Sequence, residues 1–332
     1  MKQSKFILTS IYLSLILVAL TIGDLCFGSI NLFSLETIDP LFSTILFDIR
    51  LPKTLTCILA GSGLALCGLL MQSLFRNPLA GPYVLGVSSG SSLFVAIATM
   101  LISSIQVSGF YFMGKSIVTL FSIAGAFLVT LVILIISKKN KSNITILLVG
   151  LMLGQILGAV QALIEYTSSA DNLKTFVIWG MGSVGSTTLQ DLFFVIPIYI
   201  LAITSSFFFI KPLNAILLNE QYAQNLGIDV NNLRISIIII TAILVGLITA
   251  FCGPIAFVGI SVPIASRLFF KTSHHLHQIV FCLIIGACVL LSADFICQLL
   301  GNQFLMPINT VTTLIGSPVV IYLLFKSKFS IG

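Results

Sequence analysis

Long unbroken apolar runs constrain the fold of this chain more than any other feature of its sequence. A helix needs about 20 apolar residues to cross a bilayer, and runs near that length recur along the whole chain. They cover residues 6–27, 51–75, 83–105, 116–136, 143–164, 191–210, 235–251, 255–270, 278–300 and 307–325. A membrane barrel would alternate apolar and polar residues instead. The pattern therefore predicts an all-α integral membrane protein with about ten transmembrane helices, in one domain over residues 1–332.

Composition supports a membrane-embedded chain and excludes a soluble one. Hydrophobic residues make up 58% of the sequence and charged residues only 8%, whereas about 25% of the residues in soluble domains are charged. The seven cysteines lie in apolar surroundings without a C-x-x-C pair, so we expect small core residues rather than a disulfide or zinc framework. The first apolar run is longer than the core of a signal peptide and is predicted to stay as a span.

The distribution of lysine and arginine predicts the orientation in the membrane. With a cytoplasmic N-terminus and ten alternating spans, twelve of the 16 basic residues fall on the inner side. The outer side receives only Arg50, Lys53, Lys115 and Lys174. This asymmetry agrees with the positive-inside rule and places both termini in the cytoplasm. The inner loops also explain the net charge of +6, so no nucleic-acid partner is needed.

Two stretches rich in glycine and proline interrupt the apolar runs. One lies at residues 74–86, and the other, at residues 253–259, begins with Gly253 and Pro254. The spans that precede them run in opposite directions in the predicted topology, and paired breaks of this kind are typical of the inverted repeats of transport proteins. Two tight turns, or one broken helix pair at the second stretch, are the alternatives.

Two stretches of the sequence fit nucleotide-binding motifs but lack the structural context that these motifs require. Residues 109–116 fit G-x-x-x-x-G-K-S and residues 180–185 fit G-x-G-x-x-G, but neither lies between a strand and a helix in an α/β unit. We expect the second to be a glycine-rich outer turn, with Trp179 as an interface anchor. No catalytic residue, metal site or cofactor is predicted.

The ionisable groups in or next to the spans are few. Asp294 is the only acidic residue near the middle of a span. Because placing a carboxylate in lipid costs free energy, its side chain should face protein or a water-filled cavity. A structural hydrogen-bonding role is favoured over proton coupling. His274, His275 and His277 lack further metal ligands nearby, so a solvated cytoplasmic loop is favoured over metal contact or pH sensing.

The span at residues 143–164 carries small and polar residues on one face. Gly150, Gly154 and Gly158 recur at four-residue spacing and would let another helix approach closely, and Gln155 and Gln161 add polar groups. Helix packing is the simplest interpretation. A pore-lining or subunit-contact role is the alternative.

Residues 211–234 form the longest predicted cytoplasmic segment. Its apolar positions suit a short amphipathic helix that Gly227 ends; they are Leu213, Ile216, Leu217, Tyr222, Ala223 and Leu226. Such a helix could lie on the membrane surface or dock into the groove of a partner. The pattern alone does not choose between the two.

Several blocks, in order from Arg50 to Pro318, resemble the FecCD/BtuC-like permeases, the membrane subunits of type II ATP-binding-cassette importers for ferric siderophores, haem and cobalamin. The blocks are Arg50-Leu51-Pro52-Lys53, Gly61, Gly68, Gln72, Arg76-Asn77-Pro78-Leu79-Ala80, Leu85-Gly86, Ala223-Gln224-Asn225-Leu226-Gly227, residues 253–259, Pro263, Arg267, Ala293-Asp294, Thr313 and Gly316-Ser317-Pro318.

This resemblance implies a non-catalytic permease subunit that works by alternating access in the inner membrane of a bacterium. It implies two permease copies, identical or paralogous, around a central path. Two separate ATP-binding subunits would dock beneath them, and an extracytoplasmic binding protein would deliver the cargo. A ferric siderophore is the expected cargo, with haem and cobalamin as alternatives, because the sequence contains no code for choosing among these metal chelates.

The resemblance also implies roles for individual residues. It favours partner docking for the segment at 211–234, with ATPase-coupling residues Leu213, Leu217, Tyr222, Ala223, Gln224, Leu226, Gly227 and Ile228. Arg50 and Lys53 match outward basic positions that pair with acidic residues of the binding protein. The fifth and tenth spans would line the path and join the two copies. The path or gate is assigned to Gln72, Asn77, Pro78, Leu79, Gly154 and Gln155, and structural roles to Asp294, Gly253, Pro254, Pro263 and Arg267.

The chain departs from the family pattern in two regions. At the cytoplasmic turn, Ile264 stands where the family usually has histidine, and Ser273-His274-His275 replaces Asp-His-Arg. At the outer surface, Met306 precedes Pro307 where an acidic residue is common in the family. Some relatives carry an arginine near the sequence position of Gln298. These differences concern the details of the cytoplasmic turn and of the docking surface, not the fold.

Two other function classes remain as alternatives. An ion-coupled secondary transporter would work without an ATPase and would depend on Asp294. A membrane enzyme would need an acid, a base or metal ligands that converge at one depth. The three histidines and one buried aspartate do not supply such a set.

Overall fold

The computed structural model describes residues 3–27, 40–104, 111–139, 142–300 and 306–326. These residues form helices and turns, and no strand is found among them. In chain order the helices are α1 (Gln3–Cys26), α2 (Pro40–Ser43), the π-helix η2 (Thr44–Arg50), α3 (Leu51–Phe75), the 3-10 helix η3 (Pro82–Leu85), α4 (Val87–Ser104), α5 (Tyr111–Lys139), α6 (Asn143–Thr167), α7 (Ala170–Gly180), α8 (Leu189–Phe208), α9 (Ile210–Leu218), α10 (Glu220–Asn225), α11 (Val230–Cys252), α12 (Val258–Phe270), α13 (His275–Leu300) and α14 (Ile308–Lys326).

The prediction of an all-α membrane protein is confirmed. Each predicted apolar window corresponds to one helix, and seven described helices are long and apolar enough to cross a membrane. The other three, α4, α12 and α14, contain shorter apolar stretches. One boundary differs from the prediction, because the helical stretch that includes α3 begins near Leu41 and runs without interruption to Phe75. Arg50 therefore lies inside a continuous helical stretch and not in an outer loop.

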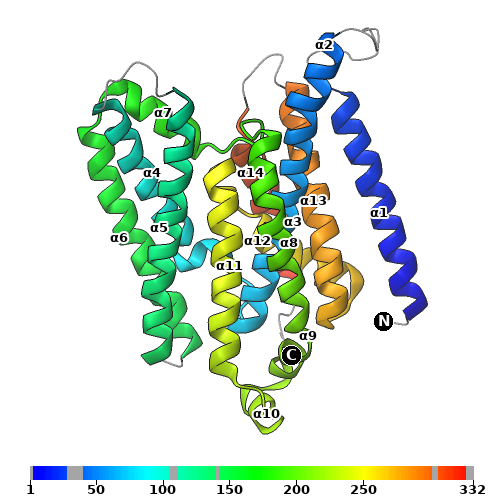
Figure 1. Ribbon diagram of the computed structural model, residues 1–332. Helices are drawn as coiled ribbons and strands as arrows, with labels where there is room; N and C mark the ends of the chain where they lie inside the picture. Colours follow the sequence, from blue (N-terminus) through cyan, green and yellow to red (C-terminus); the bar gives the residue numbers. More distant parts are fainter. Residues whose placement is uncertain (1–2, 28–39, 105–110, 140–141, 301–305, 327–332) are drawn as a thin grey trace.

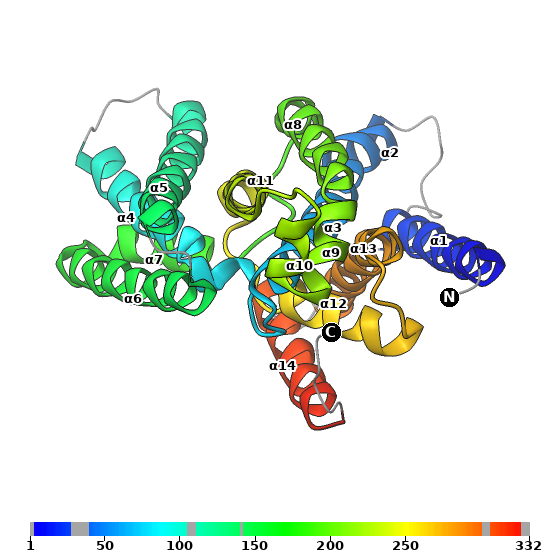
Figure 2. The same cartoon turned by 90° about the horizontal axis from the view of Figure 1, so that it is seen from below.

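Helix α3 occupies the centre of the bundle. It is surrounded by α8, α11, α12 and α13, while α4 to α7 form a group on one side and α1 lies at the opposite edge (Figure 2). Most of its side chains are buried, including Leu64, Leu69 and Met71. The start of α1, the end of α14 and the α9–α10 segment lie toward the same end of the molecule (Figure 1). This placement agrees with both termini on one side of the membrane, and their location on the cytoplasmic side stays a prediction.

Glycines let the neighbours of α3 approach its backbone directly. A Cβ atom on Gly61 would overlap with the carbonyl oxygen of Gly286 in α13, and one on Gly68 would overlap with the carbonyl oxygen of Gly259 in α12. The latter carbonyl is free of a helical N–H partner because Pro263, four residues later in α12, has none. Small residues at such crossings are typical of membrane helices, where close packing holds the helices together.

The two breaks predicted from the sequence meet inside the bundle. Tyr83 in η3 donates a hydrogen bond from its hydroxyl to the carbonyl oxygen of Ile255 in the loop before α12, and Pro82 packs against Gly259. The N–H of Ala256 in the same loop donates to the side chain of Asn309 at 3.0 Å. Non-helical backbone in a membrane is tolerated where protein satisfies its polar groups. The relation of these breaks to inverted repeats stays a prediction.

Replacing Gly68 by alanine is expected to destabilise the bundle, because the added methyl group cannot fit against Gly259 unless α3 and α12 separate. Overpacking of this kind costs about 1–3 kcal/mol, which should appear as a lower unfolding temperature in detergent. Gly23→Ala is the matched control, since a Cβ there meets nothing within 4 Å. Equal unfolding temperatures for the two variants would contradict the importance of this contact.

Candidate functional site

Two short helices, α9 and α10, project at the end of the molecule that also holds the start of α1 (Figure 1). Asn219 separates them in an extended conformation and caps α10, since its side-chain oxygen accepts a hydrogen bond from the N–H of Gln221 at 3.2 Å. Gly227 follows α10 with a φ of 81°, which L side chains rarely adopt. The predicted amphipathic segment is therefore a pair of helices with a defined end.

The two faces of this segment differ in exposure. Leu213, Ile216 and Ala223 are buried, whereas the exposed strip, which consists of Leu218, Tyr222 and Leu226, has fractional exposures of 46–66%. Of the other predicted coupling residues, Gln224 and Gly227 are exposed and Leu217 and Ile228 are half-buried. Leu213 and Ala223 were expected at the partner surface as well. The structure corrects this expectation, because both side chains face the core and hold the segment in place.

A buried histidine anchors α9 to the bundle. The Nδ1 atom of His275 lies 2.8 Å from the side-chain oxygen of Asn214 in α9, and its Nε2 atom lies 2.8 Å from the hydroxyl of Ser73 in α3. The amide oxygen can only accept, so Nδ1 donates and Nε2 accepts from Ser73. This single tautomer joins α9, α13 and α3, and we name the three side chains the histidine anchor.

The histidine anchor overturns one sequence prediction. His275 is 1% exposed and is not part of a solvated loop. His274 is exposed, as expected, and His277 is half-buried, with its ring centroid 4.2 Å from that of Phe6 in α1. The structure therefore separates the roles of three neighbouring histidines that the sequence could not distinguish.

Asp294 belongs to a polar cluster at the opposite end of the bundle. Its carboxylate lies 2.7 Å from the Nζ atom of Lys53 and accepts a hydrogen bond from Gln298 at 2.6 Å. The same amide group of Gln298 donates to Asp24 in α1, which also accepts a hydrogen bond from Thr54. Asp294 is therefore paired inside the protein, as a structural role requires. Asp24, a second acid at the end of an apolar run, was not among the residues predicted from the sequence.

Arg50 closes the end of α1. Its Nη1 atom donates to the carbonyl oxygens of Leu25 and Cys26 at 2.8 and 2.9 Å, which are unpaired within the last turn of α1. Its side chain is 6% exposed, and Lys53 is engaged by Asp294. Both residues were expected on an exposed rim. The structure instead places their cationic groups inside the bundle.

Gln72, expected along the path, lies between α3 and α12. Its amide nitrogen donates to the carbonyl oxygen of Ile260 at 3.2 Å, and its amide oxygen accepts from Arg267 at 3.1 Å. Arg267 also reaches the hydroxyl of Ser73 at 3.3 Å. These contacts hold both side chains between α3 and α12 and bury Gln72, and the structural role of Arg267 stays a prediction.

The loop after α3 contains three other path candidates, Asn77, Pro78 and Leu79. The side-chain oxygen of Asn77 accepts a hydrogen bond from the N–H of Leu79 at 2.9 Å, so Asn77 and Pro78 hold a tight turn that leaves Leu79 exposed. Gln155 is exposed on α6. Leu79 and Gln155 are thus the path candidates that the structure leaves accessible.

The glycines of α6 receive a loop of the same chain. A Cβ on Gly150 would lie 2.8 Å from the Cα atom of Leu85, and Gly154 packs against Gly86, which has a φ of 71°. Gly158 has open space within 4 Å. Two of the three glycines therefore serve the close approach of η3 and α4, and only Gly158 is left free for a contact outside the chain.

The turn between α11 and α12 contains the remaining structural candidates. Gly253 has a φ of 71° and donates its N–H to the carbonyl oxygen of Thr249 at 2.9 Å, so it ends α11 immediately before Pro254. The glycine-rich turn at 180–185 is tied to the same place, because the N–H of Ser183 donates to the carbonyl oxygen of Cys252 at 2.8 Å. Trp179 packs against Phe176, with ring centroids 6.0 Å apart.

Metal ligands do not gather in the part of the chain that the structure describes. Nowhere in it do three or more histidine, cysteine, aspartate or glutamate side chains come together as a metal site requires. The arrangement is a membrane bundle with one exposed strip at one end and a paired polar cluster at the other.

Comparison with known proteins identifies this arrangement. Vitamin B12 import system permease proteins BtuC from Salmonella paratyphi A and Salmonella typhi are each 34% identical to the chain over 318 residues, which is 95% of this chain and 94% of theirs. A structure of a metal-chelate type ABC transporter in an inward-facing conformation superimposes with a TM-score of 0.84 at 30% identity, covering 96% of this chain and 99% of that one.

A more distant structure, PsaBC from Streptococcus pneumoniae in complex with Fab, shares the fold. It has a TM-score of 0.53 and 15% identity, and the match covers 87% of this chain and 95% of that one. The model of the FecCD transport family matches residues 7–326. With matches that extend over nearly the whole length of the chain, this protein belongs to the FecCD transport family.

Proposed function

We propose that this chain is the permease subunit of an ATP-binding-cassette importer that carries a metal chelate across the inner membrane of a bacterium. The observation that carries the proposal is its similarity, over nearly its whole length, to vitamin B12 import permeases and to a metal-chelate type transporter. Cobalamin, haem and ferric siderophores are all chelates of this class, and a ferric siderophore remains the expected cargo. The permease itself has no catalytic role, and ATP hydrolysis belongs to a separate subunit.

The exposed strip on α9 and α10 is the proposed docking surface for the ATPase subunit. Leu218, Tyr222 and Leu226 are exposed apolar side chains at the end of the molecule. Helical apolar faces of this kind fit a groove on a partner, and aromatic residues such as Tyr222 often contribute most to such contacts. The family resemblance favours the ATPase over the membrane surface as the occupant.

Two copies of the permease are proposed to enclose the path. The free side of Gly158 on α6 and the exposed apolar side chains of Leu314 and Tyr322 on α14 support contacts through these two helices. Leu79 and Gln155 are proposed to face the path. Docking of the binding protein at Arg50 and Lys53 would require these side chains to leave their partners in the bundle, so they are proposed to shape the outer end rather than to bind directly.

Affinity purification of the chain from its native membrane tests the assembly. We expect an ATPase subunit and a binding protein to co-purify, with ATP hydrolysis that vanadate inhibits. The chelate that the binding protein carries identifies the cargo. A chain that purifies alone and still moves substrate into liposomes under an ion gradient would contradict the proposal.

A charge in the exposed strip should weaken ATPase docking. Leu226→Glu is expected to reduce the affinity for the ATPase subunit by at least about tenfold, as loss of a well-packed interface residue does, without changing the unfolding temperature of the permease. Ala223→Glu is the contrasting variant, because Ala223 is buried and a charge there should destabilise the permease itself. Normal binding by Leu226→Glu in a pull-down would place the docking surface elsewhere.

Variants of the Lys53–Asp294 ion pair distinguish the proposed importer from an ion-coupled transporter. Lys53→Met should destabilise the permease by about 3–5 kcal/mol, because the carboxylate of Asp294 stays buried without its partner. The double variant Lys53→Met/Asp294→Leu should recover most of that stability, measured by thermal unfolding in detergent, and should retain ATP-driven uptake. Loss of uptake in a stable double variant would instead support a proton-coupling role for Asp294.

A further inference from the structure

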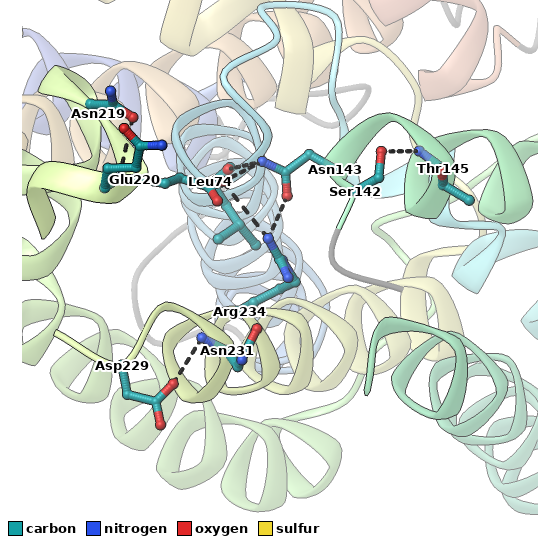
Figure 3. Close-up of polar contacts among 10 residues, drawn as sticks. Leu74, Ser142, Asn143, Thr145, Asn219, Glu220, Asp229, Asn231 and Arg234 are labelled. Atoms are coloured by element: carbon teal, nitrogen blue, oxygen red, sulfur yellow. Dashed lines mark hydrogen bonds and ion pairs between the residues drawn. The ribbon is translucent and has the colours of Figure 1, made fainter. Parts of the chain in front are cut away.

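Arg234 lies at the junction of α11, α10 and α6. The helix that carries it begins at Val230 and is capped by Asp229, whose side-chain oxygen accepts hydrogen bonds from the N–H groups of Asn231 and Asn232. Arg234 follows in the second turn, its side chain is 2% exposed, and its guanidinium points towards Asn143 at the start of α6 (Figure 3). A buried cation therefore sits where the α9–α10 segment returns to the membrane helices.

Asn143 lies between the two charges of an ion pair. Its side-chain oxygen accepts a hydrogen bond from Nη2 of Arg234 at 2.8 Å, and its Nδ2 atom donates to the carboxylate of Glu220 at 2.7 Å. The direct distance between that Nη2 and the carboxylate oxygen is 3.7 Å. The polarity of its partners fixes the orientation of the amide, because only its oxygen can face the guanidinium and only its nitrogen can face the carboxylate.

The same amide also touches the end of α3. Its Nδ2 atom lies 3.5 Å from the carbonyl oxygen of Leu74, two residues before the loop that leads to Leu79. Ser142 caps α6 by accepting a hydrogen bond from the N–H of Thr145. Asn143 is thus the point at which α6, α3, α10 and α11 meet.

The junction is incompletely satisfied, unlike the histidine anchor. Nε and Nη1 of Arg234 are buried without a hydrogen-bond partner among the described residues, and such donors are costly. The side chain of Glu220 keeps 32% of its exposure. If Asn143 withdrew with α6, the carboxylate could approach the guanidinium directly, and a charged two-point contact would compensate for the lost amide. Such an arrangement would give the buried donors of Arg234 a charged partner.

We propose that Asn143, Glu220 and Arg234 are positioning residues that transmit the position of α10 to the N-terminal end of α6. This inference rests on the proposed function, in which α10 contacts the ATPase. The histidine anchor holds α9 against α3 and α13, so α10 moves about the extended residue Asn219. Movement of α10 displaces Glu220, its first residue, and the amide of Asn143 passes this displacement to α6.

Asn143→Asp is the main test. The substitution keeps an acceptor for Arg234 and places an acid at a helix N-terminus, which favours the folded state, but the new carboxylate repels Glu220. Purified transporters in liposomes, with cobalamin, haem and a ferric hydroxamate as labelled probes, should then import at least about fivefold less chelate per ATP hydrolysed, in line with coupling energies between contacting residues. ATPase binding, hydrolysis and the unfolding temperature should stay close to wild type.

Further variants separate transmission from simple stabilisation. Glu220→Ala should cause the same loss, and combining it with Asn143→Asp should cause no additional loss, because both variants break the same link. The exchange Glu220→Arg with Arg234→Glu should restore coupling that each single change lowers, since the amide of Asn143 can rotate and serve the reversed charges. Asn232→Ala, on the same helix with its side chain bonded only to Asp229 among the described residues, is the matched control and should behave as wild type.

Each outcome decides between distinct conclusions. Wild-type chelate import per ATP in both Asn143→Asp and Glu220→Ala would overturn the inference while leaving the importer assignment intact. Loss of ATPase binding in the same variants would also overturn it, since the residues would then act in docking. Failure of the wild-type complex to import any of the three chelates with ATP would instead overturn the proposed function.

Discussion

The close contact of α3 with α12 and α13 supports the rest of the structure. In lipid, apolar surface gains little from being buried against other helices, so close packing between helices has to hold the bundle together. Gly61 and Gly68 bring the backbones of α13 and α12 against α3, and the carbonyl at the second contact is free because of Pro263. This positions α12 so that the break before it meets η3, and η3 in turn fits against the glycines of α6.

The end of α3 connects this central contact to the α9–α10 segment, which carries the proposed docking surface. Ser73 belongs to the histidine anchor, and the carbonyl of Leu74 touches Asn143. His275 is buried and both its ring nitrogens are paired. At the junction, Glu220 is half-buried, and two donors of Arg234 have no partner among the described residues. In the proposed importer, this difference would let α10 change position while α9 stays attached to α3 and α13.

Several outcomes depended on partners that the sequence could not reveal. The apolar runs predicted every major helix because lipid imposes a length and a composition on each span. Arg50 and Lys53 were expected on a rim, since a loop and a helix end look alike in this sequence, yet Arg50 closes α1 and Lys53 pairs with Asp294. Leu213 and Ala223 share the apolar pattern of Leu226, and only the packing of α9 and α10 shows which of them are buried. Asn143 carried no motif at all.

The sequence by itself determined the all-α membrane fold, the breaks at 74–86 and 253–259 and the family, because these follow from local composition and from short blocks of neighbouring residues. Only the tertiary structure decided which glycines meet, which of three histidines is buried and which polar residues join α10 to α6. Those contacts connect residues far apart in the chain, such as Ser73 with His275 and Asn143 with Arg234. Polar pairing in a helical bundle depends on the rotation and depth of each helix, and these are fixed only when all the helices pack together.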